Sequence, residues 1–494
     1  MSEPAAEPEQ HGVLTGPDAG NRAIRGGLVR TAGYGAGLLL TAIASIFLLR
    51  HLGVVRFGQF TTVIAIVTVV QGLTDAGLTV VGQRLYVHAD AVRRRTLLAD
   101  LVGIRLVLTP LGVTVGVAFA VVAGYPNALV TGTLLAGLGV VLSAVAMTLV
   151  MPLSVDLRYG RVTVVELSRQ LVIVGGIVAL VIAGSGLLPF FAVYGVAGAA
   201  GVAVALAVTG AGAWVTPRFA WSEWRPVLRE AWPVALSMVV NTTYVRALIV
   251  ISSIVATAEQ TGLFATSYRV SEILLGVPQM MIGAAFPILA HAHVADARRL
   301  AYVLQRMGEA ALLLGLGLGL VLVLGAEPIV QLLGGSEFAA AADPLRIQSV
   351  AIAGAFLTQV GTIGLIAIQR QRQLVLVNLV ALVVVLVLGF TLIPLWGANG
   401  AALAASIGEV VLAITALAML ARVRPDLRPS LRYVPKLVAA AGIAGLCVLL
   451  PLPAVVQTML AVGVYGGLAL MFRAVPAELF EALPGRRAGG AAGG

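Results

Sequence analysis

The chain has 494 residues, of which 59% are hydrophobic and only 11% are charged. A soluble globular protein carries about 25% charged residues, so this composition excludes an ordinary soluble domain and indicates a protein whose solvent is a lipid bilayer. The net charge of +10 fits basic loops on the cytoplasmic side of a membrane, and we expect no nucleic-acid partner.

Apolar stretches recur along nearly the whole chain and predict an all-α integral membrane protein, because a span needs about 20 apolar residues. Residues 1–28 are rich in Pro, Gly and acids and are expected to form a disordered cytoplasmic tail. Residues 473–494 are expected to form a flexible cytoplasmic tail. The fourteen expected transmembrane helices are 29–49, 58–81, 97–123, 128–152, 163–183, 187–210, 233–256, 263–289, 308–326, 344–368, 374–394, 399–421, 437–450 and 454–472.

Basic residues alternate between the loops that join these helices. Nearly all loop Lys and Arg residues lie in one set of loops and in the two tails, whereas the opposite set holds only Arg50 and Arg56. The excess of positive charge on cytoplasmic loops predicts that both termini lie in the cytoplasm. An even number of spans also places both termini on one side, so the two observations agree.

Aromatic and charged side chains share a short segment before the seventh span. Trp221, Trp224 and Leu228 occupy one helical face, and the charges lie largely elsewhere. This pattern is typical of a helix that lies in the headgroup region. The expected domains are an N-lobe at 29–215, an interfacial linker helix at 216–232, a C-lobe at 233–421, and a basic loop with the last two spans at 422–472.

Two short motifs recur at nearly the same separation along the chain. GQF from Gly58 follows the first span, and GLF from Gly262 follows the seventh. YGVAGAA from Tyr194 opens the sixth span, and WGANGAA from Trp396 opens the twelfth. We therefore expect two six-helix lobes in a parallel pseudo-twofold repeat, plus two C-terminal helices. Substrate sites in such transporters lie between the repeats.

Charged side chains inside a span cost about 2.5–3.5 kcal/mol on insertion scales, so they mark cavities or ion pairs. Glu409 has no obvious cation nearby in the sequence, and Asn241 and Arg246 lie well inside the seventh span. For Arg246 a cavity role and an ion pair to another helix both remain open. The charges near cytoplasmic ends, which we expect to snorkel or pair, are Asp100, Arg105, Glu166 and Arg169.

A polar stripe runs along one face of the eighth span, and the second span repeats the pattern. The stripes comprise Arg269, Glu272, Gly276, Gln279 and Gly283 in one helix and Thr61, Ala65, Thr68, Gly72, Asp75, Thr79 and Gly82 in the other. Close helix packing would also explain the small residues, but packing alone needs neither Arg269 nor Asp75. We therefore expect both stripes to line one aqueous cavity. The candidate substrate-binding residues are Arg269, Arg246, Glu272, Asp75, Asn241 and Gln279.

Several segments together resemble oligosaccharide flippases, which share a superfamily with multidrug exporters and lipid II flippases. These segments are LLRHLGVVRFGQF (48–60), LTDAGL (73–78), GLFATSYRVSEILLGVPQMMIGAAFPILA (262–290), GGSEFAAAADPLRI (334–347) and IPLWGANGAALA (393–404). The resemblance implies two lobes around a central cavity in the bacterial inner membrane. It also implies movement of undecaprenyl-diphosphate-linked sugars from the inner to the outer leaflet.

For Arg269, the resemblance implies the role of the cavity arginine that lipid II flippases need near the start of their eighth span. Those flippases also carry basic residues in their first two spans, and the body of both spans lacks Arg in this chain. Another lipid-linked oligosaccharide or polymer is therefore expected in place of lipid II itself.

The expected function is a flippase that works by alternating access, with Arg246 and Arg269 attracting the diphosphate. Asp75 and Glu272 are either sites for a coupling H⁺ or Na⁺ or counter-ions of arginines, and membrane potential is another source of drive. The alternatives are a multidrug exporter of the same superfamily and a non-transporting scaffold for polysaccharide assembly. The expected partners are the lipid-linked glycan, membrane lipids, and glycosyltransferases and a polymerase of the same pathway, with the chain itself acting as a monomer.

The sequence predicts no enzyme and no cofactor. The longest external loop, about 327–343, holds acids but neither the His nor the Arg that a polymerase or ligase site would add to them. His291 and His293 have no third ligand nearby, and the single cysteine excludes a cysteine metal site. The sequence contains no phosphate-binding GxxxxGK[ST] motif, so direct use of ATP is not expected.

Overall fold

The computed structural model describes residues 19–475 apart from Ala76, 211–214, Asp296 and 429–430. Within the helices, the side chains of 19–32, 277–297, Arg299, Gln371 and Leu431 lie outside this description. The described residues form helices joined by short turns, and no strand occurs among them. The predicted all-α class is therefore confirmed.

The helices follow one another closely along the chain. They are α1 (Ala19–Asp75), α2 (Leu78–Val87), α3 (Ala91–Val122), α4 (Asn127–Leu149), α5 (Met151–Val155), α6 (Tyr159–Ile182), α7 (Leu187–Thr209), α8 (Trp221–Val255), α9 (Ala258–Ala295), α10 (Ala297–Gly334), α11 (Ala342–Ala367), α12 (Gln371–Val423), α13 (Val434–Gly445) and α14 (Ala454–Met471), with short 3₁₀ turns between some of them. Among the described residues, 10 helical stretches are long and apolar enough to cross a membrane. The chain is thus an all-helical membrane protein.

Two of the long helices contain a break at a glycine. Gly53 in α1 has φ 68° and ψ 175°, and Gly397 in α12 has φ 54° and ψ −126°. Positive φ values cost little at glycine because it has no Cβ atom. Both breaks fall where the sequence predicts a turn between successive spans, so each long helix consists of two segments that meet at a glycine.

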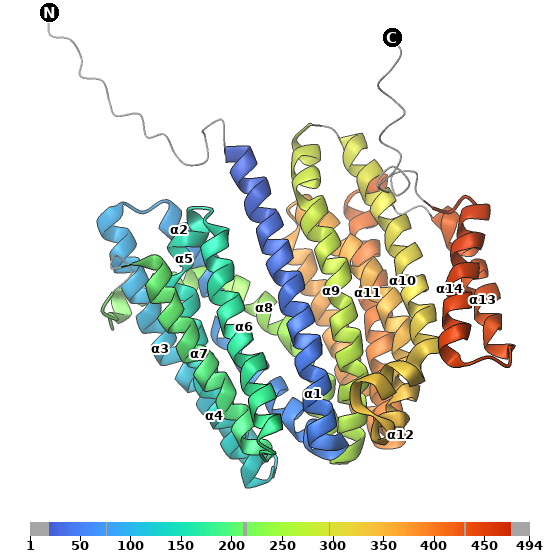
Figure 1. Ribbon diagram of the computed structural model, residues 1–494. Helices are drawn as coiled ribbons and strands as arrows, with labels where there is room; N and C mark the ends of the chain where they lie inside the picture. Colours follow the sequence, from blue (N-terminus) through green and yellow to red (C-terminus); the bar gives the residue numbers. More distant parts are fainter. Residues whose placement is uncertain (1–18, 76, 211–214, 296, 429–430, 476–494) are drawn as a thin grey trace, which may run out of the picture.

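The helices gather into two lobes (Figure 1). In the first lobe, α4 packs against α3 and α7, and α6 packs against α7. In the second lobe, α11 packs against α10 and α12, and both α13 and α14 pack against α10. α1 packs against α6 on one side and against α8 and α9 on the other, so it lies at the interface between the lobes.

The bundle has two faces that later sections distinguish. α1 begins and α14 ends on one of them, which we call the terminal face (Figure 1). The opposite face, which we call the distal face, is where the two segments of α1 meet and where α13 turns into α14 (Figure 1). For each cavity between the lobes we can therefore say whether it lies nearer the terminal face or the distal face.

Near the distal face the two lobes meet at a pair of glycines, one from each lobe. A Cβ atom added at Gly58 of α1 would lie 2.6 Å from the carbonyl oxygen of Ala258 and 2.7 Å from the backbone nitrogen of Gly262. A Cβ atom added at Gly262 of α9 would overlap the carbonyl oxygen of Val54. Both glycines open the GxF motifs of the sequence repeat, so the two copies of that motif pack against each other.

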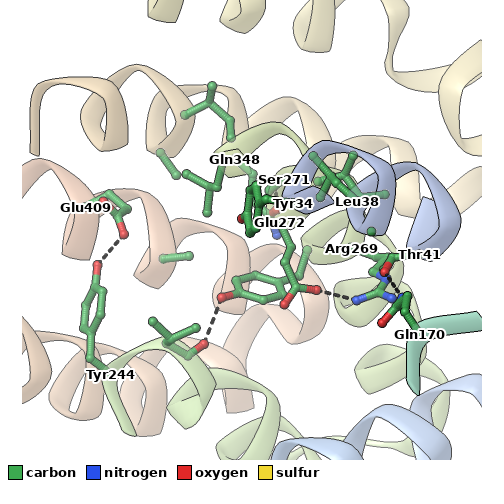
Figure 2. Close-up of a pocket in the computed structure, with 18 of the residues that line it drawn as sticks. Tyr34, Leu38, Thr41, Gln170, Tyr244, Arg269, Ser271, Glu272, Gln348 and Glu409 are labelled. Carbon is green, nitrogen blue, oxygen red and sulfur yellow. Dashed lines mark hydrogen bonds and ion pairs between the residues drawn. The ribbon is translucent and has the colours of Figure 1, made fainter. Parts of the chain in front are cut away.

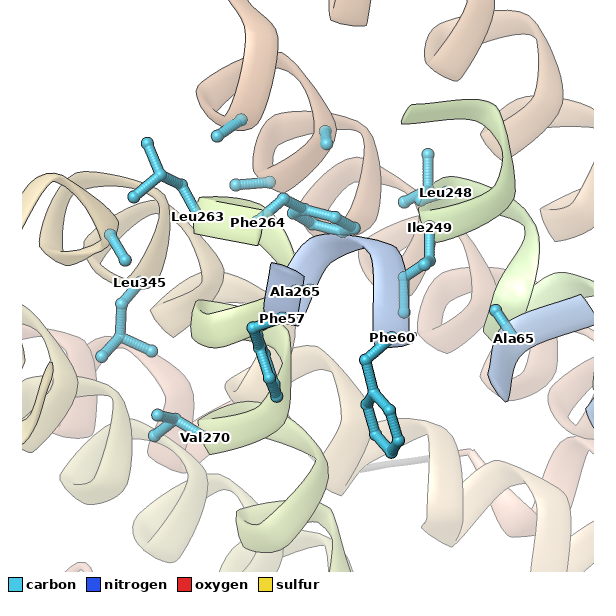
Figure 3. Packing of buried hydrophobic residues seen from close by; sticks show 14 of the residues in the cluster. Phe57, Phe60, Ala65, Leu248, Ile249, Leu263, Phe264, Ala265, Val270 and Leu345 are labelled. Carbon is cyan, nitrogen blue, oxygen red and sulfur yellow. The ribbon is translucent and has the colours of Figure 1, made fainter. Parts of the chain in front are cut away.

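Buried phenylalanines surround this glycine contact. Figure 3 shows Phe57 and Phe60 of α1 beside Phe264 of α9. Phe57 also packs edge-on against Phe338 of the second lobe, with 6.5 Å between ring centroids. A side-chain hydrogen bond of 2.8 Å from Arg50 to the carbonyl of Leu332 adds a further link. The lobes are therefore closed together on the distal face.

The segment expected as a separate linker helix is continuous with the seventh span. α8 runs from Trp221 to Val255 and contains both Pro226 and Pro233. Trp224 is buried against α2 and α3, whereas Trp221 is exposed. The first turns of α8 therefore connect the two lobes and rest on the first of them.

Ion pairs also join the start of α8 to the first lobe, between Arg84 and Glu230 and, at 3.0 Å, between Arg93 and Glu223. Exposed pairs of this kind contribute about 0–1 kcal/mol. We expect Glu230→Gln to change the free energy of unfolding by less than about 1 kcal/mol in detergent, because a third or more of each side chain is exposed. A larger loss in thermal unfolding would show that this contact holds the lobes together.

Candidate substrate cavity

A cavity of about 420 Å³ lies between the lobes, and we call it the arginine cavity. Its walls come from α1, α6, α8, α9, α11 and α12. Figure 2 shows Glu409 and Tyr244 on one side and Arg269, Thr41 and Gln170 on the other, with Glu272 between them. The cavity therefore has contributions from both lobes and contains charges of both signs.

Two arginines share one carboxylate at the centre of this site. Glu272 accepts a hydrogen bond of 2.6 Å from Arg269 and one of 2.7 Å from Arg246. Arg269 and Glu272 are three residues apart on α9, which places them on one helical face. Arg246 reaches the same carboxylate from α8. The three side chains are 17–29% exposed and together carry one excess positive charge.

The two arginines have more hydrogen-bond donors than Glu272 can accept. One further donor of Arg269 bonds to the Ser45 hydroxyl at 2.8 Å. The Nε atom of Arg246 is buried and has no hydrogen-bond partner among the described residues. A guanidinium carries five N–H groups in a planar fork that matches carboxylate or phosphate oxygens. The cluster therefore has one excess positive charge and more N–H donors than Glu272 uses, a combination that favours an anion.

A small pocket of about 60 Å³ continues from the cluster toward the distal face. Arg246, Arg269 and Glu272 line it together with Phe57 and Phe60. The phenylalanines belong to the contact that closes the distal face. The charged cluster thus lies directly behind the closed end of the pathway between the lobes.

Arg169 is a cavity residue that the sequence reasoning did not select. It was expected to snorkel or pair near the end of its span, but it lines the arginine cavity from α6 beside Gln170. Gln170 donates a hydrogen bond to Thr41 of α1. A polar stripe of Thr163, Glu166 and Gln170 on α6 would have indicated this face, because positions three and four residues apart share one side of a helix.

A second cavity of about 560 Å³, which we call the asparagine cavity, contains two of the other candidates. Asn241 donates a long hydrogen bond of 3.3 Å to Asn378. Asp75 accepts hydrogen bonds of 2.6 Å from Arg105 and 2.7 Å from Thr79. Arg105 is almost completely buried. Of the two expectations for it, snorkelling or pairing, the structure shows pairing, with Asp75 as the partner.

The expectation that the whole of both stripes lines one cavity does not hold for Asp75, although Thr61 of the second span lines the small pocket together with Arg269 and Glu272. Asp75 lines the asparagine cavity, whereas Arg269 and Glu272 line the arginine cavity. The reason is that α8 packs closely on this part of α1: a Cβ atom at Gly72 would lie 2.7 Å from the Thr242 hydroxyl. The side chain of Gln279 lies outside the described part of the chain, so its predicted role stays a prediction.

The family model of polysaccharide biosynthesis proteins matches residues 23–293, more than half of the chain. The chain belongs to this family. Among curated proteins, none matches it. The predicted resemblance to flippases of polysaccharide synthesis is therefore confirmed at the level of the family.

Solved structures show which fold this polysaccharide biosynthesis protein has. It is similar to the lipid II flippase MurJ in an inward closed conformation, with a TM-score of 0.74 and 11% identity over 90% of this chain and 99% of that one. It is also similar to a MOP superfamily transporter from Pyrococcus furiosus, with a TM-score of 0.58 and 14% identity over 86% and 100%.

A third similar structure is the MATE multidrug transporter DinF-BH, with a TM-score of 0.60 and 17% identity over 85% of this chain and 98% of that one. Identities this low establish the fold alone. The chain is thus a multi-pass membrane protein with the fold of MOP superfamily transporters.

Proposed function

We propose that this protein moves undecaprenyl-diphosphate-linked oligosaccharide or polysaccharide precursors from the inner to the outer leaflet of the bacterial inner membrane. The observation that carries the proposal is the cluster of Arg246, Glu272 and Arg269 between the two lobes: Arg269 and Glu272 line the arginine cavity, and Arg246 lines the small pocket behind it. Two guanidinium groups with one carboxylate leave a positive charge that favours an anionic head group. Charge-assisted hydrogen bonds from arginine to phosphate are short and strong.

The proposed topology has fourteen spans with both termini in the cytoplasm. The 10 apolar stretches become twelve when α1 and α12 are each divided at their glycine breaks, and α9 and α13 complete the set. The proposed domains are a cytoplasmic tail at 1–28, an N-lobe at 29–215, a connecting segment at 216–232, a C-lobe at 233–421, a basic loop with the last two spans at 422–472, and a tail at 473–494. The two lobes form a parallel repeat, and the contact between their GxF motifs supports this.

Alternating access follows from this topology. The terminal face is then cytoplasmic, and the distal face is external. Tyr34 and Glu166 line the arginine cavity and are exposed, whereas Gly58 and Gly262 close the distal face. The conformation is therefore one that admits substrate from the cytoplasm. The sugar and diphosphate would occupy the cavity while the lipid tail stays in the bilayer.

The protein would work as a monomer and meet its substrate in the membrane. Glycosyltransferases and a polymerase of the same pathway are the proposed partners, since the lipid-linked glycan must be made before it is moved and consumed afterwards. The position of Arg246 and Arg269 supports an anionic substrate over the cationic drugs of a multidrug exporter, because like charges in a cavity repel.

Replacing Arg269 tests the proposal. Hydrogen bonds to charged groups contribute about 1.5–3 kcal/mol, so Arg269→Ala should slow flipping of a fluorescent undecaprenyl-diphosphate-linked oligosaccharide about tenfold or more in proteoliposomes. Flipping is read from protection of the fluorophore against an impermeant reductant. Arg269→Lys keeps the charge but loses the planar guanidinium, so its flipping rate should lie between those of wild type and Arg269→Ala.

The matched control is Arg346→Ala, because Arg346 lies outside both cavities and pairs with Asp343 at 2.6 Å. This variant should flip the substrate at the wild-type rate. Undiminished flipping by Arg269→Ala would remove the arginine from the mechanism. Efflux of a cationic dye without any flipping would instead identify a multidrug exporter, and glycan export that survives loss of the cavity arginines in cells would favour a scaffold.

A further inference from the structure

Glu409 lies in the wall of the arginine cavity opposite Arg269 (Figure 2). It comes from α12, in the middle of an apolar stretch that includes residues 372–423. A charged carboxylate inside a membrane is costly unless it has a partner, about 2.5–3.5 kcal/mol for Asp on insertion scales. The state of this carboxylate therefore needs an explanation.

Two other carboxylates inside the spans are neutralised by arginine. Glu272 bonds to both Arg246 and Arg269, and Asp75 bonds to Arg105. Glu409 forms no ion pair with any residue that the structure describes. Its carboxylate accepts a hydrogen bond of 2.8 Å from the Tyr244 hydroxyl, and the Thr358 hydroxyl of α11 is a second neutral donor beside it. Glu409 thus has a neutral partner in place of a cation.

The surroundings of Glu409 supply few other charges. The titratable groups that face it are Tyr244 from α8 and Tyr268 from α9. α11 meets it with Gly354, where a Cβ atom would lie 3.4 Å from the Cβ of Glu409. The first half of α12 contributes Val385 to the same cavity wall. Across the cavity are the charged groups Arg246, Arg269, Glu272, Arg169 and Glu166.

Tight packing holds the tyrosine on the carboxylate. Gly408 precedes Glu409, and a Cβ atom at Gly408 would lie 3.7 Å from the Tyr244 hydroxyl and closer still to Val385. Tyr244 itself is buried. A donor fixed in this way can serve either state of the acid, because a protonated carboxyl also keeps an oxygen that accepts the hydrogen bond.

We propose that Glu409 is a proton-binding site whose occupation is linked to anion binding in the arginine cavity. The inference rests on the proposed function for its substrate, a lipid diphosphate. An ionised Glu409 offsets the excess positive charge of the cavity, and a bound diphosphate repels it. Binding of the anion therefore draws one proton from water onto the Glu409 carboxylate, and protonation in turn strengthens anion binding by the same factor.

The first test needs no substrate. Purified protein in nanodiscs is titrated with acid and base while the infrared C=O band of protonated carboxyl groups is recorded. Wild type should show a band that disappears as the pH rises, and Glu409→Gln should lack it. Tyr244→Phe should keep the band to higher pH, because it removes the donor that stabilises the ionised form.

Glu327→Gln is the matched control, since Glu327 is exposed on α10 and bonded only to Gln331 in the described structure. Its spectrum should keep the wild-type membrane carboxyl band. An identical titrating band in Glu409→Gln, or no such band in wild type, would overturn the proposal.

The second test measures the linkage with undecaprenyl diphosphate as the probe. In weakly buffered nanodiscs with a pH dye, wild type should take up a proton when the probe binds, and Glu409→Gln should bind the probe without proton uptake. Equal uptake by both proteins would contradict the linkage. If the probe binds to neither protein, the diphosphate substrate is wrong, and the infrared titration still decides whether Glu409 is a proton site.

Discussion

Glu272→Gln is expected to reduce the free energy of unfolding by about 3 kcal/mol, the lower end of the range for breaking a buried ion pair. The variant leaves Arg246 and Arg269 facing each other with no carboxylate between them. Their side chains are 17% and 29% exposed, so water relieves only part of this cost. Thermal and denaturant unfolding in detergent measure the loss of stability. The rate of flipping should also fall, because the geometry of the cavity changes.

Two further variants separate charge from packing at this position. Glu327→Gln makes the same chemical change at an exposed glutamate and should leave stability within about 0.5 kcal/mol of wild type. The double variant Arg246→Gln/Glu272→Gln removes one charge of each sign and should recover much of the stability lost by Glu272→Gln. If Glu272→Gln unfolds at the wild-type temperature, the carboxylate does not hold the two arginines together.

Gly262→Leu is expected to prevent the distal face from closing. The new side chain would overlap the backbone of Val54 across the interface between the lobes. Forcing extra atoms into a packed contact costs about 1–3 kcal/mol, which is enough to shift an equilibrium between two conformations of similar energy by about fivefold or more. Because flipping needs both conformations, the rate should fall with the loss of the closed one.

Spin labels report this opening directly. With the native Cys447 replaced by serine, labels at Arg50→Cys and Leu332→Cys span the contact where the Arg50 side chain now bonds to the Leu332 carbonyl. The distance between the labels should lengthen in Gly262→Leu. Gly466→Leu is the control, because a Cβ atom at Gly466 meets nothing within 4 Å. An unchanged distance in Gly262→Leu would mean that the glycine contact does not hold the distal face shut.

Features that depend on a single helix could be predicted from the sequence. The apolar runs predict the all-α membrane class, and the turns expected near Gly53 and Gly397 coincide with the breaks in α1 and α12. The pairing of Arg269 with Glu272 follows from a spacing of three residues on one helix. In each case a local pattern contains all the information that the feature requires.

Contacts between helices could not be predicted in the same way. Arg246 pairs with Glu272 on α9, and Asp75 pairs with Arg105 on α3. Periodicity within one helix does not identify which helix lies beside it. Glu409 showed no cation nearby in the sequence, and its tyrosine partner lies 165 residues away. The division of one expected cavity into two likewise depends on how closely α8 approaches Gly72.

The central claim is that the arginine cluster binds the diphosphate of a membrane-linked glycan. The most direct measurement compares binding of undecaprenyl diphosphate to wild type and to the charge-neutral triple variant Arg246→Gln/Arg269→Gln/Glu272→Gln by native mass spectrometry. This variant keeps a polar side chain at all three positions and leaves no charge in the cluster, so it should remain folded. We predict that it loses at least about tenfold in affinity, since each lost charge-assisted hydrogen bond contributes about 1.5–3 kcal/mol. Equal binding by the two proteins would contradict an arginine-based site.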